Sequence, residues 1–524
     1  DPLIGATILA KGTSAGTVTD VDGSYSLSAP ANTTSLIISY TGFVTREIEL
    51  GSSNVVDVEL ESDILNINEV VVVGYGTQQR RDITGTISSI KGSDLAASPV
   101  QSFDQALQGR AAGVNVSLPN GVLNNPPVFR IRGINSINLS SFPLIVLDGV
   151  PTFTGDQSGN NAANNVLSNI NPNDIESIEI LKDAAAAAIY GSRASAGVVL
   201  ITTKRGKEGK TKISYDGWAG FTSAARRFDL LNAEQYVAYK NEAARNANLP
   251  DQFFLETIDG KVVDTDWYDY ILQTGKSQNH GLSFSGGNAG TTYFLSLGYS
   301  NQEGMIVSNT FERLSGRLSL DHKLGKKVKV GANLGYTTNS NAAPSTGSLP
   351  GQAFGTSGLG RIPLVTAPNI PAYNADGSYN IASNNQPGRY RNIQQVGFVN
   401  PVTIIDLNSF TSEADQLQAA VFVDVNLFKG LTYRTQYGID QLSVENISFQ
   451  SPVHGDGFGT SGAATNKVSS LERWNWQHLL TYDFSLAEKH NFSFLVGDEQ
   501  QRTVSSSWGA QRTVIGDPFF TTYQ

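Results

Sequence analysis

The sequence predicts a β-rich, mixed fold: a small N-terminal β-sandwich and an α+β domain, followed by a transmembrane antiparallel β-barrel. Three observations lead to this fold class. Charged residues are only 16% of the 524 residues and glycine occupies 52 positions, which favours strands and turns over helical bundles. After residue 210, apolar residues alternate with small or polar ones, and the connections between these segments alternate between short and long.

The first 61 residues are predicted to form the small β-sandwich. Residues 36–40 and 55–60 are strand-like, because β-branched and apolar residues dominate them, and glycines punctuate the domain. The sequence begins within what reads as an ongoing strand at residues 3–8. We therefore expect the front end of this domain to be missing from the sequence.

Residues 62–80 are predicted to be a linker with one extended segment. Four consecutive valines, 70–73, favour an extended chain, and the flanking Asn, Gly and Gln residues argue against a packed core. A protein partner can join such a strand by β-augmentation. The alternative interpretation is that the valines form the first strand of the next domain, and the two arrangements can be two states of one switch.

Residues 81–209 are predicted to form a compact α+β domain. The five consecutive alanines of the second predicted helix are followed by Gly191, a helix stop signal. The predicted helices are 102–108 and 183–190, and the predicted strands are 84–90, 114–117, 128–132, 143–147, 175–181 and 197–203.

Residues 210–524 are predicted to form about nine barrel strands. Residues 417–427 and 474–484 show the alternation clearly, and aromatic residues lie at both ends of the second segment. Short connections are expected at 286–290, 324–327, 428–430 and 485–489, and long ones at 223–277, 301–310, 339–411 and 448–468. A soluble β-sandwich, the alternative, has no reason to sort its loops by length, so the pattern favours a membrane barrel.

Several function classes are excluded by composition and spacing. A net charge of −10 argues against nucleic-acid binding, and the absence of Cys removes disulfides and thiolate chemistry. The five His residues lack metal-ligand spacing, and no acid, base or nucleophile constellation is present. We therefore predict no enzyme, no catalytic residues, no cofactor and no metal site.

The chain resembles the N-terminal portion of a SusC-type (SusC/RagA-like) TonB-dependent outer-membrane transporter of Bacteroidetes. The motifs that carry the resemblance are dense over the first 210 residues, whereas the barrel matches in pattern only. They are L-I-G-A at 3–6, S-Y-T-G-F at 39–43, N-E-V-V-V-V-G-Y-G at 68–76, L-Q-G-R-A-A-G-V at 107–114, I-R-G-I-N-S at 131–136, V-L-D-G-V-P at 146–151 and N-P-N-D-I-E-S-I-E-I-L-K-D-A at 171–184.

The resemblance implies four parts. It assigns 1–61 to a carboxypeptidase-regulatory-like extension, 62–80 to a linker with a TonB-box-like segment, 81–209 to the plug and 210–524 to the first part of the barrel. Transporters of this kind close 22 strands around a plug. Since about nine strands are present, we expect the sequence to be part of a longer transporter.

The implied function is TonB-dependent import of oligosaccharides or peptides across the outer membrane. TonB, working with ExbB and ExbD, would displace the plug by pulling on residues 68–74, with Glu69, Val70, Val71, Val72 and Val73 as its binding residues. A SusD-like surface lipoprotein would form the extracellular lid, outer-membrane lipid would surround the barrel, and the N-terminal extension would be periplasmic. The alternatives are a siderophore or cobalamin receptor, a transporter-like signal receptor and an adhesin.

Two loops are predicted to contact the substrate. Asn135, Ser136 and Asn138 lie in a plug loop rich in amides and hydroxyls, which can hydrogen-bond a sugar or a peptide. The long loop at 339–411 carries Tyr373, Tyr379 and Tyr390, and aromatic rings with amides suit carbohydrate stacking. The alternatives are a solvated plug loop and an outer surface that docks a partner protein.

Overall fold

The structure is a computed structural model, and the chain divides into two compact units, Asp1–Gly85 and Thr86–Gln524. Each unit is described by itself. The residues that the structure describes are 3, 5–11, 13, 15–30, 33–40, 43, 45–50, 55–60, 70–73, 76–79, 86–96, 100–136, 141–158, 162–183, 187–344, 359–381, 399–486 and 490–517.

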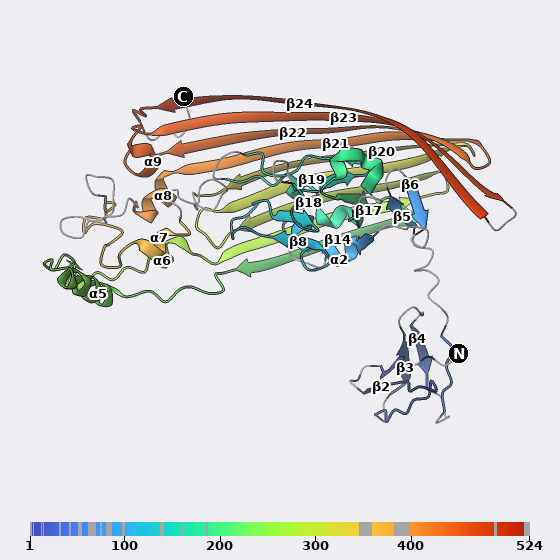
Figure 1. The fold of residues 1–524 in the computed structure, drawn as a ribbon, viewed down its shortest axis with the longest axis horizontal. Helices are drawn as coiled ribbons and strands as arrows, with labels where there is room; N and C mark the ends of the chain where they lie inside the picture. The colour runs from blue at the N-terminus through green and yellow to red at the C-terminus, as the bar shows by residue number, and fades with distance from the viewer. Residues whose placement is uncertain are drawn as a thin grey trace. The chain divides into compact units, whose positions relative to one another are not determined.

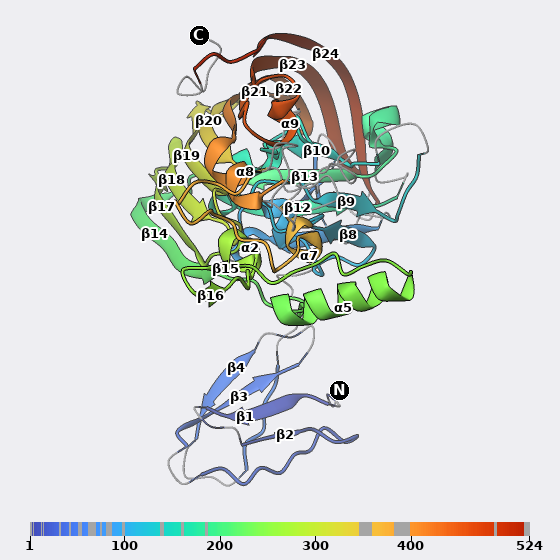
Figure 2. The same ribbon diagram turned by 90° about the vertical axis from the view of Figure 1, so that its left-hand side faces the viewer.

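The first unit contains a four-stranded antiparallel sheet in the order β2-β1-β3-β4 (Figure 2). Ile8, Leu36 and Ile38 point to one face and are buried, while Tyr25 and Leu27 pack partly buried against them. A separate antiparallel hairpin follows. The strands are β1 Thr7–Ala10, β2 Gly16–Val18, β3 Ser35–Ser39 and β4 Arg46–Glu49, and the hairpin consists of β5 Val70–Val73 and β6 Gly76–Gln79.

The second unit begins with a plug built on a five-stranded sheet in the order β11-β10-β13-β12-β7. β10 and β13 run parallel, and the other pairs are antiparallel. Its strands are β7 Ile87–Lys91, β10 Leu144–Leu147, β11 Val150–Pro151, β12 Ile175–Leu181 and β13 Val198–Thr203, with a separate hairpin of β8 Val114–Ser117 and β9 Val128–Ile131.

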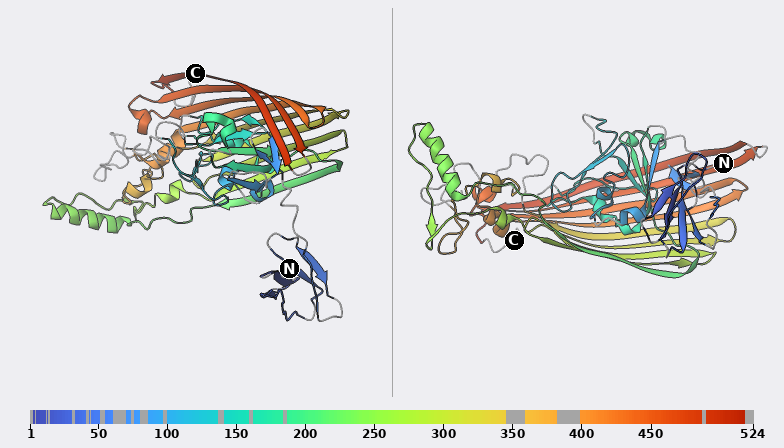
Figure 3. Two further views of the ribbon diagram at one scale, coloured as in Figure 1. Left: turned by 45° about the vertical axis from the view of Figure 1, so that its right-hand side comes forward. Right: turned by 90° about the horizontal axis from the view of Figure 1, so that it is seen from below.

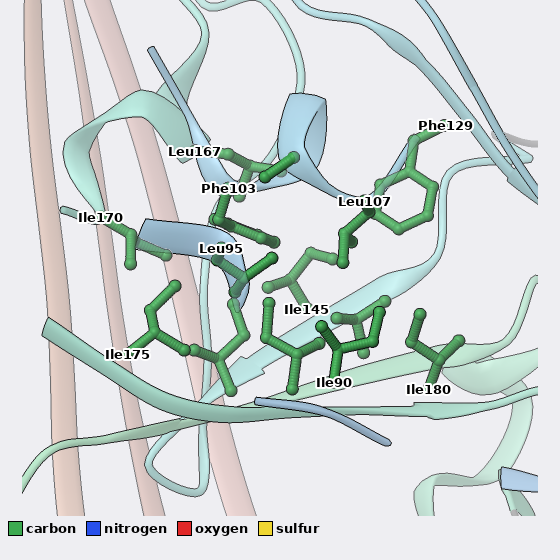
Figure 4. Close-up of a cluster of buried hydrophobic side chains, with 14 of the residues drawn as sticks. Ile90, Leu95, Phe103, Leu107, Phe129, Ile145, Leu167, Ile170, Ile175 and Ile180 are labelled. Atoms are coloured by element: carbon green, nitrogen blue, oxygen red, sulfur yellow. The ribbon is translucent and has the colours of Figure 1, made fainter. Parts of the chain in front are cut away.

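Short helical segments cover the plug sheet and close its core. Ile145, Ile175 and Ile180 from the sheet meet Leu95 and Phe103 from two helices, all buried (Figure 4). The segments are α2 Gly92–Ala96, α3 Phe103–Ala106 and the 3-10 helices η2 Val166–Asn169, η3 Pro172–Asp174 and η4 Ala188–Ala194.

A nine-stranded antiparallel sheet curves around the plug (Figures 1 and 3). Each strand pairs with the next along the chain, which confirms the predicted number of strands. They are β14 Gly209–Thr222, β17 Gly275–Gly287, β18 Thr291–Glu303, β19 Thr310–Leu324, β20 Val328–Ala342, β21 Ser409–Phe428, β22 Leu431–Gln450, β23 Ala463–Leu486 and β24 His490–Thr513. The connections between these bounds alternate between long and short, as predicted.

The long connections carry their own secondary structure. Helix α5 Ala233–Asn246 has a capping box in which Asn232 and Gln235 bond each other's backbone N–H groups. The other elements are the hairpin β15 Thr257–Ile258 and β16 Lys261–Val262, with α6 Tyr268–Ile271, α7 Ile362–Val365, α8 Pro401–Leu407 and α9 Gly455–Phe458. No helix among the described residues is both long and apolar enough to cross a bilayer.

The register gives the large sheet two distinct faces. Leu334, Ala419 and Ile439 are directly paired neighbours on the outer face, and Leu334 is 46% exposed. The next row, with Gln418 and Asp440, faces the plug. Aromatic residues gather on the outer face at two levels, as in membrane barrels. Tyr482, Phe484, Phe492 and Phe494 lie beside the short turn between β23 and β24, whereas Tyr336, Tyr437 and Trp476 lie further along their strands from the short turns.

Candidate substrate gate between plug and barrel wall

The plug turn between β10 and β11 fits closely against the wall, because glycines stand on both sides of the contact. Gly149 has a φ of +86°, and a Cβ there would lie 2.8 Å from the Gln436 amide nitrogen. On the wall, a Cβ at Gly438 would lie 2.3 Å from Cγ2 of Val150. Any larger residue at position 438 would push this turn away from the wall.

Three wall side chains donate hydrogen bonds to main-chain carbonyls of this plug segment. Gln436 Nε2 donates to Asp148 O and Gln477 Nε2 to Gly149 O, both at 2.9 Å. Arg473 Nη1 donates to Pro151 O at 3.2 Å. Because β22 and β23 are neighbours, these donors lie side by side and together bind three carbonyls of the β10–β11 turn and of β11.

Asp440 holds the next two plug residues. Its carboxylate is fully buried, and it accepts hydrogen bonds from Thr152 Oγ1 at 2.8 Å and from the Phe153 backbone N–H at 3.1 Å. Gln416 Nε2 donates to the other carboxylate oxygen at 2.7 Å. A buried carboxylate is stable only with such donors, so plug and wall satisfy each other here.

A second plug turn, at η3, enters a socket of two glycines. Gly281 and Gly298 face each other on β17 and β18. A Cβ at Gly298 would lie 2.4 Å from Nδ2 of Asn171, and one at Gly281 would lie 3.1 Å from Nδ2 of Asn173. Side chains at these two wall positions would therefore displace the Asn171 amide and crowd that of Asn173.

The residues beside this socket are buried and polar. Burial raises the pKa of the Asp174 carboxyl, and the charge of Arg317 opposes that shift. Arg313 Nη1 donates to the backbone carbonyls of Gln101 and Ser168. The wall therefore fixes several plug segments through main-chain contacts, in addition to the apolar packing of Phe153 and Val166 against β21 and β22.

Amide side chains make up much of the remaining interface. Asn169 Nδ2 donates to Gln416 Oε1 at 2.9 Å, and Thr337 Oγ1 donates to the Asn169 carbonyl at 3.0 Å. Asn164 Nδ2 donates to Asn339 Oδ1 at 3.2 Å. Water can replace neutral hydrogen bonds of this kind at small net cost, so such an interface can separate and close again.

A charged cluster fixes the end of the plug where the chain enters the barrel. Asp321 bonds Arg205 at 3.1 Å and Lys329 at 3.2 Å. Three cations surround the ring of Phe422, with Arg434 Cζ 4.3 Å from its centroid and Arg205 Cζ and Lys329 Nζ each 5.4 Å away. Salt bridges and cation–π contacts together join the last plug residues to β19, β20, β21 and β22.

The predicted TonB-binding segment is described only in part. Val70–Val73 form β5, paired antiparallel with β6, while Glu69 lies outside the described residues. Of the predicted plug-loop contacts, Asn135 donates through Nδ2 to the Ser195 carbonyl at 2.6 Å, and Ser136 is half-buried. Asn138 lies outside the described residues.

The predicted loop tyrosines lie in a packed outer loop. The rings of Tyr373 and Tyr379 are 5.7 Å apart, and Tyr270 stands 6.3 Å from Tyr373. Tyr379 donates its hydroxyl to Asp406 at 3.1 Å, and burial together with this carboxylate raises its pKa to about 12. Tyr390 lies outside the described residues.

The hydrogen bonds between the plug and the barrel wall were not predicted from the sequence. Gln436, Gln477 and Asp440 read as ordinary inner-face strand residues, and the detectable signal is that polar and glycine residues alternate there with aromatic ones. A cavity of about 550 Å³ in the long loops was also missed, because it joins three separate segments. Its walls are 227–232, Tyr236, Tyr239 and Lys240 of α5, 264–268, 363–366 and Pro368.

Comparisons with known proteins agree with this architecture. Residues 79–198 match the TonB-dependent Receptor Plug Domain family, and residues 1–72 match the CarboxypepD_reg-like domain family. The structure resembles that of the RagAB peptide importer in the 'open-open' state, with a TM-score of 0.71 and 27% identity over 85% of this chain and 50% of that one. These features define the chain as a TonB-dependent receptor, and neither matched family is catalytic.

Curated relatives show to which group of TonB-dependent receptors the chain is similar. TonB-dependent receptor P26 of Formosa agariphila is 34% identical over 510 residues, which is 95% of this chain and 48% of that protein. TonB-dependent receptor SusC of Bacteroides thetaiotaomicron is 35% identical over 409 residues, 76% of this chain and 38% of that protein. The chain thus belongs with the SusC-like TonB-dependent receptors, which are outer-membrane β-barrel proteins, and it spans about half the length of the curated relatives it matches.

Proposed function

We propose that this chain supplies the plug and part of the barrel wall of an outer-membrane importer of oligosaccharides or peptides. The observation that carries the proposal is the polar contact between plug and wall. A permanent structural contact gains most from apolar packing, whereas much of this contact rests on amide, hydroxyl and main-chain hydrogen bonds that water can replace. It therefore suits a part that must leave the wall and return.

Energy for this movement would enter through residues 69–73. β5 belongs to a two-stranded sheet, so within the described residues one of its edges has no strand partner. TonB would add a strand to that edge, or replace β6, and pull. ExbB and ExbD would power TonB.

The proposed substrate class is supported by the proposed contacts and by one solved relative. Asn135, Ser136 and Asn138, with Tyr373, Tyr379 and Tyr390, supply amides, hydroxyls and rings that suit a sugar or a peptide. A SusD-like surface lipoprotein would cover the long loops as a lid. One solved relative is described as a peptide importer, which supports the peptide arm of this proposal.

The test uses the full-length protein that contains this chain, expressed in its native outer membrane. Val71→Pro with Val73→Pro removes two backbone N–H groups and prevents strand addition. The matched control, Val71→Thr with Val73→Thr, keeps both N–H groups and the β-branched shape. We expect the proline variant to abolish growth on peptides or on oligosaccharides as sole carbon source at unchanged surface abundance, and the control to grow. Wild-type growth of the proline variant would contradict the proposal.

A further inference from the structure

A basic rim is formed by three of the connections at the short-turn end of the barrel wall. Three stretches, 204–212, 323–329 and 429–434, hold 11 of the 37 Lys and Arg residues and a single acidic residue, Glu208. The whole chain carries a net charge of −10, so this positive charge is local. The three stretches are the crossing from plug to β14, the turn from β19 to β20 and the turn from β21 to β22.

The rim has two layers with different partners. Arg205 and Lys329 pair with Asp321 inside the wall, and Lys323 pairs with Glu208 at 3.5 Å. By contrast, Lys326, Lys327 and Lys429 are exposed in the turns, and none of the described carboxylates pairs with them. We call these three residues the turn lysines. Their charge is left for a partner outside the chain.

The outer face beside the turn lysines is apolar and aromatic. Leu324 is 53% exposed and Phe428 is 61% exposed, and each lies within two residues of a turn lysine. On β23 and β24, Tyr482, Phe484 and Phe492 stack with ring centroids 5.1 and 5.2 Å apart. Aromatic girdles of this kind lie at the level of the lipid headgroups. The turn lysines follow this girdle directly, so their ammonium groups lie at phosphate level.

We propose that the turn lysines bind the phosphate groups of anionic phospholipids in the leaflet at the short-turn end of the barrel. Their alkyl stems cover the girdle, and their ammonium groups reach the phosphates as compact charges. This inference rests on the proposed placement of the barrel in the outer membrane, but not on TonB, the lid or the substrate. A lysine near an anionic lipid surface contributes attraction equivalent to about fivefold in binding.

The test measures lipid retention by the full-length protein and does not involve transport. The protein is extracted from nanodiscs of phosphatidylcholine doped with phosphatidylglycerol, and native mass spectrometry counts each retained lipid. In Lys326→Gln, Lys327→Gln, Lys429→Gln we expect the preference for phosphatidylglycerol to fall by up to about a hundredfold, at roughly fivefold per lysine. High salt should weaken the wild-type preference in the same direction.

Two control variants make the result specific. Lys261→Gln, Lys276→Gln, Lys467→Gln removes three exposed lysines at the long-loop end and should leave the preference unchanged. Replacing the turn lysines by arginine keeps the charge and should restore the preference, which separates lost charge from a folding defect.

Four outcomes would overturn the inference. The first is equal phosphatidylglycerol preference in wild type and the glutamine variant, and the second is equal loss in the long-loop control. The third is an unchanged lipid preference while the glutamine variant alone releases a co-purifying acidic protein, which would assign the turn lysines to a protein partner. Competition by inorganic phosphate at equal charge would show that free phosphate, rather than the lipid, is the ligand. Failure of the importer proposal would show only in the growth assay.

Discussion

The Asp440 carboxylate provides a quantitative test of how the plug is held. Asp440→Ala removes the acceptor of the Thr152 hydroxyl and of the Phe153 N–H, both buried. Each donor left without a partner costs about 1–2 kcal/mol once water enters the vacated space. The two together weaken docking of this plug segment by about 3 kcal/mol. That corresponds to about a hundredfold rise in the detached population.

Hydrogen exchange measures that population directly. In the full-length protein we expect exchange across 148–153 to rise by about a hundredfold in Asp440→Ala and by less in Asp440→Asn, which keeps one acceptor. Asp498→Ala is the matched control, because Asp498 is an exposed carboxylate on β24. Unchanged exchange at 152–153 in Asp440→Ala would refute the assignment of Asp440 as the anchor of this segment.

Three further perturbations test other contacts. Gly438→Leu should displace the plug turn between β10 and β11 and raise ion conductance through the barrel in planar bilayers, and adding Val150→Ala should partly reverse the rise. Unchanged conductance in Gly438→Leu would argue against the close fit of Val150 on Gly438. Asp321→Ala leaves Arg205 and Lys329 without this carboxylate partner, so trypsin should cleave within 204–207 faster than in wild type. Equal cleavage rates would contradict the role of Asp321 in fixing this end of the plug. Burial lowers the pKa of His454 to about 4, so the contribution of the neutral, buried His454 to folding stability is fully present above about pH 6.5. It is lost as the pH falls toward 4, and exchange around 452–458 should rise over that window in wild type but not in His454→Phe.

The barrel was predictable from the sequence because its signal has a period of two. Apolar residues recur at every second position over 417–427, and burial alternates with the same period over 409–416 of this strand. Within the expected helix at 183–190, 184–186 lie outside the described residues, Ala187 is helical and donates its N–H to the Asp183 carbonyl at 3.1 Å, and the 3-10 helix η4 follows at Ala188–Ala194. Gly191, expected to end the helix, lies inside η4 with a φ of +62° and kinks it.

The contacts between the plug and the barrel wall were not predictable, because each contact joins residues far apart in sequence. Val150 and Gly438 are separated by the second half of the plug and six barrel strands, and neither is unusual in its own segment. A hydrogen bond from Gln436 to the Asp148 carbonyl carries no side-chain signal on the plug side. Sequence reasoning identifies which face of a strand points inward, but not which plug turn that face receives.

The arrangement of the plug sheet indicates which part yields first if TonB pulls as proposed. The pulled chain would enter the plug at Thr86, directly before β7, and β7 is the edge strand of the sheet, paired only with β12 among the described strands. Because the pair is antiparallel and the pulling force would act first at Ile87, the hydrogen bonds between β7 and β12 would break one after another rather than all at once. Each such bond contributes about 1 kcal/mol. The wall contacts at Asp440, at η3 and at Arg205 would bear the pulling force together only after β7 has separated from β12. β7 would therefore detach before the plug separates from the wall.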